Sequence, residues 1–303
     1  MSPMPLTFSP ALQEFLKQYE GTPATKHHVA VFDCDGTIIK GDIGEAMFYY
    51  QIEHFLLRVN PANIWLDHPK RDELDNLYTQ LTALPSDRRT HDRRFISFSE
   101  MIVEWYFDQL MEGNTEKACS DIVRLLSKFT EQEVKQIALS TFNEELASPI
   151  TFRKFGKHSV PKGIRYINES VALLKELQRL HFDVWAISGS NKWSITPVFS
   201  QLGIPDDRII GIELQLASNT YTPKVHMPVP VLQGKVEALQ SLTDIEPLLV
   251  VSDSIYDVPL FKYATAKKIF VNSRMETSYS FFKEANIVQD DSWIVIEKPT
   301  LQE

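Results

Sequence analysis

An apolar, β-branched run that ends in two acids constrains this chain more than any other stretch. Val29 to Phe32 has the pattern of a strand buried on both faces of a parallel sheet. Asp33 and Asp35 follow directly, with Gly36 after them. An unpaired buried carboxylate is costly, so two acids here need a reason. Ligands of open α/β sheets bind just outside the carboxyl ends of strands, which predicts a site; a capping acid beside a turn acid is the alternative.

A second apolar run ends in the same way. Leu248 to Val251 predicts another buried strand, which is followed by Asp253 and, four residues later, by Asp257. An acid at a helix start can simply interact with the helix dipole, which is the alternative for Asp257. Four acids at the ends of two strands would repel one another without a cation. Oxygen ligands suit Mg²⁺, so we expect a magnesium site.

Two further segments could bind an anion. The predicted strand 182–187 runs into Ser188-Gly189-Ser190-Asn191 and then a helix, where small residues let backbone N–H groups approach a phosphate. N-capping by Ser190 or Asn191 is the alternative. Lys235 stands near a predicted helix start, where the helix dipole disfavours a cation, although it could simply be solvated.

These segments together resemble the haloacid dehalogenase-like hydrolase superfamily, whose members are mostly phosphatases. Asp33-Cys34-Asp35-Gly36-Thr37 matches the first signature, Asp-x-Asp-Gly-Thr, without departure. Ser188 matches the second signature, and Lys235 matches the third better than Lys192 or Lys224. Asp253 and Asp257 match the fourth signature, Gly-Asp-x-x-x-Asp, with Ser252 in place of the glycine.

The resemblance implies a Mg²⁺-dependent phosphomonoester hydrolase. Asp33 would be the nucleophile that forms an aspartyl-phosphate, and Asp35 the general acid and base. Ser188, Gly189, Ser190 and Lys235 would bind the phosphoryl group, and Thr37 would help to position it. The implied metal ligands are Asp33, the main-chain carbonyl of Asp35, and Asp253, with Asp257 behind them.

Three other activities fit the same scaffold. A phosphotransferase would share all four signatures and differ only in its acceptor. A carbon–halogen hydrolase needs no acid to protonate its leaving group, so Asp35 argues against it. A non-catalytic binding protein would be expected to lose one of the acids, and none is missing.

The distribution of periodic segments predicts the architecture. Strands alternate with helices from Gly163 onward, which indicates a doubly wound parallel sheet, whereas the segments from about 44 to 152 have helical spacing. Thr130 and Glu133 form a capping-box pattern. Prolines and charges at 70–73 and 87–94 predict loops there. We therefore expect an α/β class protein, a Rossmann-like core (1–42 and 160–303) with a helical cap (43–159) inserted after the first strand.

Composition narrows the function further. The formal net charge of −9 argues against non-specific binding to nucleic acid or to anionic membranes. No apolar run approaches the ~20 residues that span a bilayer, and the first residues lack a signal-peptide pattern. The only cysteines are Cys34 and Cys119, too few for a disulfide framework. We expect a cytoplasmic enzyme with a small-molecule phosphomonoester substrate.

The substrate can be narrowed only by resemblance. The chain is similar to the phosphoserine phosphatase-like branch, which includes phosphatases of phosphocholine and phosphoethanolamine. In phosphoserine phosphatases an acid nine residues past the nucleophile pairs with the substrate amine, and Asp42 has that spacing here; it could equally be a helix cap. No arginine matches the one that would hold a serine carboxylate. Aromatic residues near an acid can bind an ammonium head, so phosphocholine or phosphoethanolamine is expected ahead of phosphoserine; the candidates are Tyr49, Tyr50, Trp65, Trp105 and Tyr106.

Overall fold

A six-stranded parallel sheet forms the centre of the molecule. The computed structural model describes residues 8–21, 28–59, 68–273, 291–297 and 299–302. The strand order is β12-β11-β10-β1-β6-β7, and every neighbouring pair is parallel. The strands are β1 (Val29–Phe32), β6 (Asp183–Asn191), β7 (Ile209–Ile212), β10 (Leu249–Ser252), β11 (Lys267–Asn272) and β12 (Trp293–Glu297). The predicted parallel sheet of an α/β protein is confirmed.

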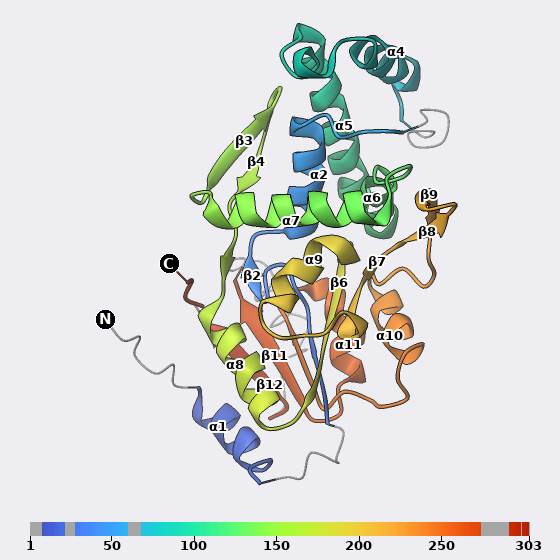
Figure 1. Ribbon diagram of the computed structural model, residues 1–303. Helices are drawn as coiled ribbons and strands as arrows, with labels where there is room; N and C mark the ends of the chain where they lie inside the picture. The colour runs from blue at the N-terminus through green and yellow to red at the C-terminus, as the bar shows by residue number, and fades with distance from the viewer. Residues whose placement is uncertain (1–7, 22–27, 60–67, 274–290, 298, 303) are drawn as a thin grey trace.

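Alternate residues of β1 face opposite sides of this sheet. Ala30 and Phe32 pack in a core with α1 (Pro10–Lys17), α8 (Asn168–Arg179) and α9 (Lys192–Ser200). Val29 and Val31 pack on the other side with α10 (Gln233–Gln240) and α11 (Val258–Tyr263). Side chains of a strand alternate between faces, so a run of four apolar residues is required where helices cover both. Figure 1 shows this arrangement.

A mainly helical segment lies above the sheet in Figure 1. Its helices are α2 (Ile43–Glu53), α4 (Arg71–Thr82), α5 (Arg93–Met111), α6 (Thr115–Arg124) and α7 (Glu131–Ala147). They share one apolar cluster, which also takes in Trp193 of α9 and Val231 from the core. The helical segment thus packs directly on the α/β core. Its description as a domain spanning 43–159 stays a prediction.

The short strands complete the description. The hairpin β3 (Thr151–Phe155) and β4 (His158–Lys162) follows α7, and the hairpin β8 (Leu214–Ala217) and β9 (Thr220–Val225) follows β7. Neither hairpin is predicted by the sequence. In β3 Arg153 is buried while Phe152 is exposed, and in β8 only Leu214 is buried, so neither strand buries an alternating apolar face. The pair β2 (Ile39–Lys40) and β5 (Arg165–Tyr166) joins the points where the chain leaves and re-enters the core. Single 3-10 turns lie at Ser86–Arg88, Asp206–Arg208 and Ile255–Asp257.

The loop predicted at the charge cluster 70–73 is wrong. Residues Arg71–Thr82 form α4, in which Leu74, Tyr78 and Leu81 are buried at helical spacing. The charged residues there are the first turn of the helix, where acids favour the helix dipole. At 87–94 the chain forms a 3-10 turn and then begins α5, whose first turn is capped by Asp92. Pro61 and Trp65, between these segments, lie outside the described residues.

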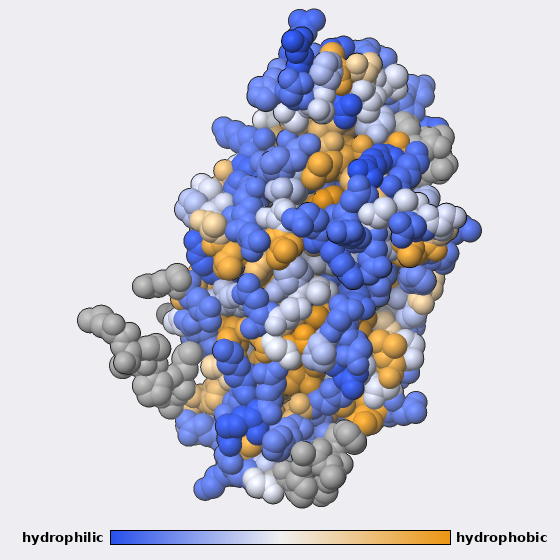
Figure 2. Space-filling view, in the orientation of Figure 1, coloured by the Kyte–Doolittle hydropathy of each residue, from blue (hydrophilic) through white to orange (hydrophobic). Residues whose placement is uncertain are grey.

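Other features of the sequence agree with the structure. The capping box is present at α7, because the Thr130 side chain accepts from Glu133 N and the Glu133 side chain accepts from Thr130 N. In the part of the chain that the structure describes, no helix has the length and apolarity to cross a membrane. On the face shown in Figure 2, hydrophobic residues are interspersed among hydrophilic ones.

Candidate active site

Three acids and one lysine lie together just beyond the carboxyl ends of β1 and β10. These strands pair in parallel with Phe32 opposite Val251, so Asp33 and Asp253 emerge side by side. Lys235 Nζ donates to Asp33 Oδ1 at 2.8 Å and to Asp257 Oδ2 at 2.8 Å. All four residues are buried, with no more than 5% of any of them exposed; they are Asp33, Lys235, Asp253 and Asp257. Burial lowers the pKa of Lys235, but the charges of Asp257 and Asp33 outweigh it, so the net shift is upward and the ammonium persists.

Thr37 links Asp33 to Asp253, the acid that Lys235 is not seen to contact among the described hydrogen bonds. Its Oγ1 lies 3.2 Å from Asp33 Oδ2 and 3.3 Å from Asp253 Oδ1, and it accepts a hydrogen bond from Asp253 N at 3.0 Å. A hydroxyl carries a single hydrogen, so it donates to one carboxylate at a time. The two carboxylate oxygens therefore converge on one point at the end of the sheet. Ser273 Oγ lies 3.4 Å from Asp253 Oδ2 on the other side.

This set of residues suits a divalent cation. Asp33, Asp253 and Asp257 with Lys235 carry a formal net charge of −2 in a buried setting, which is costly without compensation. The donors are oxygens, which Mg²⁺ prefers. No group of three or more His, Cys, Asp or Glu side chains in the described residues could hold a metal by itself. The carboxylates of Asp33 and Asp253 converge at Thr37, whereas their role as metal ligands with the main-chain carbonyl of Asp35 stays a prediction.

Asp35 has different surroundings from the other acids. Its Oδ2 accepts hydrogen bonds from Ser188 Oγ at 3.1 Å and Ser190 Oγ at 2.7 Å, and its Oδ1 accepts one from Ile43 N at 2.7 Å. Burial, then the charges of Asp42 and Asp33, raises the pKa of Asp35 to about 8, against the lowering effect of the hydrogen bonds. The Asp35 carboxyl is therefore largely protonated at neutral pH, which suits a proton donor.

Gly44 lets α2 approach this carboxyl. A Cβ atom on Gly44 would lie 2.2 Å from Ser190 Oγ, a distance that real contacts do not show. The glycine thus makes room for the serine that donates to Asp35. Sequence reasoning did not assign Gly44 to the site, since a glycine at a helix start carries no chemical signal of its own.

The Ser188–Asn191 segment caps a helix and also lines the site cavity, whereas anion binding by it stays a prediction. β6 continues to Asn191, four residues past the predicted strand end. Asn191 is the N-cap of α9, because its Oδ1 accepts from Ser194 N at 2.8 Å. Ser190 is not that cap, and its N–H donates to Ser188 Oγ at 2.9 Å. Ser188, Gly189 and Ser190 all line the site cavity.

The third and fourth signatures also meet in this site. Lys235 is the third residue of α10, and a Cβ on the preceding Gly234 would lie 1.9 Å from Val229 O. Lys192 instead lies 3.6 Å from Asp206 and Glu213, and neither it nor Lys224 is among the described residues lining the cavity.

Ser252, which stands in place of the glycine of the fourth signature, makes hydrogen bonds within the turn that follows it. Its Oγ donates to Asp257 Oδ2 at 2.6 Å and accepts from Ser254 N at 3.1 Å. The serine hydroxyl therefore holds the turn that brings Asp257 back toward Lys235.

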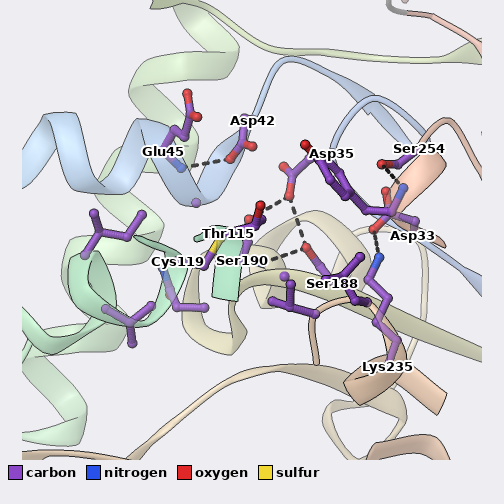
Figure 3. Close-up of a pocket in the computed structure, with 18 of the residues that line it drawn as sticks. Asp33, Asp35, Asp42, Glu45, Thr115, Cys119, Ser188, Ser190, Lys235 and Ser254 are labelled. Carbon is purple, nitrogen blue, oxygen red and sulfur yellow. Dashed lines mark hydrogen bonds and ion pairs between the residues drawn. The ribbon is translucent and has the colours of Figure 1, made fainter. Parts of the chain in front are cut away.

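A cavity of about 250 Å³ opens beside these groups. The α/β core contributes the Ser188–Asn191 segment, Lys235 and three of the acids, Asp33, Asp35 and Asp257. Helices α5 and α6 contribute the opposite wall. Figure 3 shows Asp35 between Asp33 and Asp42, with Ser188 and Ser190 beneath it. The helical-segment residues that line the cavity are Gly44 and Glu45 of α2, together with Tyr106, Leu110, Thr115, Cys119, Ile122 and Val123.

Asp42 fits both of the interpretations that its position suggested. It is the N-cap of α2 and accepts from Glu45 N at 2.8 Å, and it also lines the cavity. Of the five candidate aromatic residues, Tyr106 lines the cavity, whereas Trp105 is buried in the helical core. Tyr49 and Tyr50 also lie outside the described lining, and Trp65 is outside the described residues. Glu45, which lines the cavity too, was not singled out, because only the acid nine residues past Asp33 had a motif to match.

Comparison with known proteins identifies the family. The sequence profile of the haloacid dehalogenase-like hydrolase family matches residues 106–262, just over half of the 303 residues. The chain belongs to the haloacid dehalogenase-like hydrolase family. The matched span contains Ser188, Lys235, Asp253 and Asp257, and the Asp33–Thr37 signature precedes it. The predicted superfamily resemblance is confirmed, and the chain is a hydrolase of that family. No curated protein is significantly similar in sequence.

Solved structures share the fold of this hydrolase. A conserved protein of unknown function from Anaerococcus prevotii DSM 20548 matches with a TM-score of 0.75 and 16% identity, over 96% of this chain and 93% of that one. A protein of unknown function from Bordetella pertussis Tohama I matches with a TM-score of 0.56 and 14% identity, over 90% and 99%. A phosphoserine phosphatase described as a phospho-aspartyl intermediate analogue has a TM-score of only 0.46 at 16% identity, over 91% and 95%, a likeness that does not bear on activity.

Proposed function

We propose that this chain is a Mg²⁺-dependent phosphatase that hydrolyses small phosphomonoesters through an aspartyl-phosphate intermediate. The observation that carries this proposal is the contact of Lys235 with Asp33 in the same buried site that holds Asp35 and Asp253. An ionised carboxylate, a protonated carboxyl and a fixed cation are the groups that phosphoryl transfer to an acid requires.

In the first half of the reaction, an Asp33 oxygen attacks phosphorus while the ester bond breaks. The Lys235 ammonium at Asp33 Oδ1 orients the nucleophile and attracts the phosphoryl oxygens. Asp35 gives its proton to the departing alkoxide, so the leaving group departs as an alcohol. Ser188, Gly189 and Ser190 line the cavity, so this segment is the proposed contact for the phosphoryl oxygens.

In the second half, Asp35 is ionised and acts as a base. It takes a proton from water, whose oxygen attacks phosphorus and releases the Asp33 carboxylate with inorganic phosphate. Ser188 and Ser190 donate to Asp35 Oδ2, which orients the carboxyl for both steps.

Asp33, Asp253 and the main-chain carbonyl of Asp35 would hold the magnesium ion, with Asp257 supporting them through Lys235. When bound, the ion supplies positive charge against the phosphoryl oxygens. We also propose that the helices of residues 43–159 act as a cap, since side chains of α5 and α6 line the cavity wall opposite the core.

The cavity favours a small substrate with a cationic leaving group. Its volume of about 250 Å³ is below the range of typical drug-sized pockets. Among the described lining residues there is no arginine, and the one lysine is paired with Asp33 and Asp257. A carboxylate on the leaving group would therefore lack a partner. Amino- or trimethylammonium-alkyl phosphates fit better than phosphoserine, and Asp42 is the acid placed to pair with them.

The test is hydrolysis of p-nitrophenyl phosphate with excess Mg²⁺ and with EDTA. We expect turnover with Mg²⁺, loss with EDTA, and recovery when Mg²⁺ is restored. During turnover of a labelled phosphoester, the phosphoryl group should remain on the acid-precipitated protein and be released by hydroxylamine, as an acyl phosphate is. Turnover that is unaffected by EDTA, or a protein that carries no label, would contradict the proposal.

Added alcohols distinguish a hydrolase from a phosphotransferase. A hydrolase releases free phosphate in their presence, whereas a phosphotransferase forms the phosphorylated alcohol.

A further inference from the structure

The leaving-group end of the cavity contains a second acid besides Asp42. Figure 3 shows Asp42 beyond Asp35 and Glu45 beyond Asp42, on the first turn of α2. Both residues line the cavity. The one lysine among the described residues that line this cavity, Lys235, is engaged at the phosphoryl end by Asp33 and Asp257. Two carboxylates at the other end of the cavity favour a positively charged group there.

Two tyrosines hold the Glu45 carboxylate in place. Tyr49 OH, one turn along α2, lies 3.2 Å from Glu45 Oε2, and Tyr106 OH on α5 lies 3.0 Å from Glu45 Oε1. Burial, followed by the charge of Glu45, raises the pKa of both tyrosines, so they stay neutral donors. A carboxylate oxygen can accept more than one hydrogen bond, so a held carboxylate can still bind a ligand N–H.

Other acids at the same place in a helix do not need this support. Glu133 is likewise the third residue of its helix, α7, and it folds back onto the N-cap in the capping box. The Glu45 side chain is held instead by hydroxyls from two different helices, one of them the cavity-lining Tyr106. A carboxylate fixed from both sides at a cavity wall is preorganised for binding.

The lining also indicates which kind of cation fits. A quaternary ammonium is bound by several aromatic faces, and Tyr106 is the one aromatic residue of the cap region among the described lining residues. A primary ammonium has three N–H donors and needs carboxylate acceptors. Resting on the proposed phosphatase activity, we propose that Glu45, held by Tyr49 and Tyr106, is a specificity residue that binds a primary ammonium on the leaving group together with Asp42.

The experiment compares kcat/KM for phosphoethanolamine, ethyl phosphate and phosphocholine in wild type and in Glu45→Gln. Ethyl phosphate has the same two-carbon chain without the ammonium, and phosphocholine has a cation without N–H donors. We expect wild type to prefer phosphoethanolamine to both. In Glu45→Gln, the ratio of kcat/KM for phosphoethanolamine to that for ethyl phosphate should fall by about 10- to 100-fold, mainly through KM. This is the factor expected for one charge-assisted hydrogen bond.

Two variants make the comparison specific. Tyr106→Phe keeps the ring but removes one hydroxyl, so the same preference should fall by about 2- to 10-fold, as for one neutral hydrogen bond. Asp108→Asn removes a charge from an exposed position of the same helix, outside the described lining, and should leave the preference at the wild-type value. A thermal melt of each variant checks its fold.

The outcomes separate this inference from the proposed function. If wild type hydrolyses phosphomonoesters but Glu45→Gln and Tyr106→Phe leave the preference unchanged, the role of Glu45 is overturned and the phosphatase proposal stands. The same holds if phosphocholine or ethyl phosphate is the better wild-type substrate. If wild type hydrolyses no phosphomonoester in Mg²⁺, the proposed function fails and this inference fails with it.

Discussion

Asp33 differs from the other acids of the site because its two oxygens face two different elements. One accepts from Lys235 of α10, and the other lies beside Thr37 and, through it, Asp253 of the neighbouring strand. Asp35, two residues on, accepts instead from two serines and a backbone N–H. Two carboxyls of one short turn thereby have different surroundings, which suits the division of roles between a nucleophile and a proton donor.

Replacing Asp33 by Asn should abolish turnover. The amide cannot attack phosphorus and is a poor metal ligand, whereas its oxygen can still accept from Lys235. We expect kcat for p-nitrophenyl phosphate to fall by more than about 10³-fold with little change in Tm. Multiple turnovers at a rate near that of wild type would contradict the assignment of the nucleophile.

Replacing Asp35 by Asn should have an effect that depends on the leaving group. An alkoxide needs the proton, whereas p-nitrophenolate leaves without one, so the loss of kcat/KM should be larger for an alkyl phosphate than for p-nitrophenyl phosphate by about 10²-fold. Paired single-turnover rates for the two esters measure this directly, since they report the first chemical step. Equal losses would show that Asp35 is not the proton donor.

At the scale of elements, the first turn of α2 brings several functions together. Asp42 caps the helix, Gly44 admits Ser190, and Glu45 reaches the tyrosines, all within one turn. The first turn of α7 has a similar sequence pattern but only stabilises its helix, with Glu133 bound to both Thr130 and Arg58. The same cap chemistry therefore serves stability in one helix and lines the cavity in the other.

The α7 cap predicts a pH-dependent contribution to stability. The hydrogen bond from Arg58, and then that from Thr130 N, lowers the pKa of Glu133 to about 2 from its ordinary value of 4.5. A lowered carboxyl pKa stabilises the fold above the unfolded pKa, and this stabilisation is lost as pH falls from about 4.5 to about 2. Glu133→Gln should lower Tm by about 1–2 °C at pH 7, because the pair is partly exposed.

Thermal melts of wild type and Glu133→Gln across this pH range check the prediction. The difference in Tm should shrink toward zero at the acid end. Thr130→Ala should cost about 1 kcal/mol, and part of that loss should remain at low pH, because the Thr130 hydroxyl also accepts from the Glu133 backbone N–H. A difference between wild type and Glu133→Gln that does not change with pH would rule out the ionised pair as its source.

At the scale of the whole molecule, the sheet brings together residues that are 216 positions apart, such as Thr37 and Asp253. Their meeting depends on β1 lying between β10 and β6, since both neighbours then deliver their carboxyl ends to Asp33. The helical segment covers the result, and α7 packs against α9 where the two layers meet (Figure 1). The site therefore forms only in the complete fold. The formal net charge of −2 on its buried acids and lysine should lower the stability of that fold.

Magnesium should therefore raise Tm. The buried acids and Lys235 carry a formal net charge of −2, which a bound divalent cation offsets in the folded state only. At a concentration 100 times Kd the stabilisation is about 2.7 kcal/mol, or roughly 3–5 °C for a chain of this size. Melts in Mg²⁺ and in EDTA measure it.

Two variants provide the controls for this shift. Asp253→Asn should lose the Mg²⁺ response, whereas Asp121→Asn, which changes a buried acid paired with Lys117 and Arg124, should keep it. A wild-type Tm that is the same in Mg²⁺ and EDTA would argue against a resident metal.

Local patterns in the sequence determined the strands of the central sheet, most helices and the chemically distinctive site residues. Apolar runs that end in acids can be recognised from sequence, because burial is unfavourable for a charged side chain. The acids found in this way are Asp33, Asp35, Asp253 and Asp257. Only the tertiary structure decided the roles of Gly44, Ser252 and Glu45, since each depends on a neighbour from elsewhere in the chain or on a turn's geometry. It also decided that Arg71–Thr82 is a helix, because Leu74 and Leu81 are buried by packing that their charged neighbours conceal.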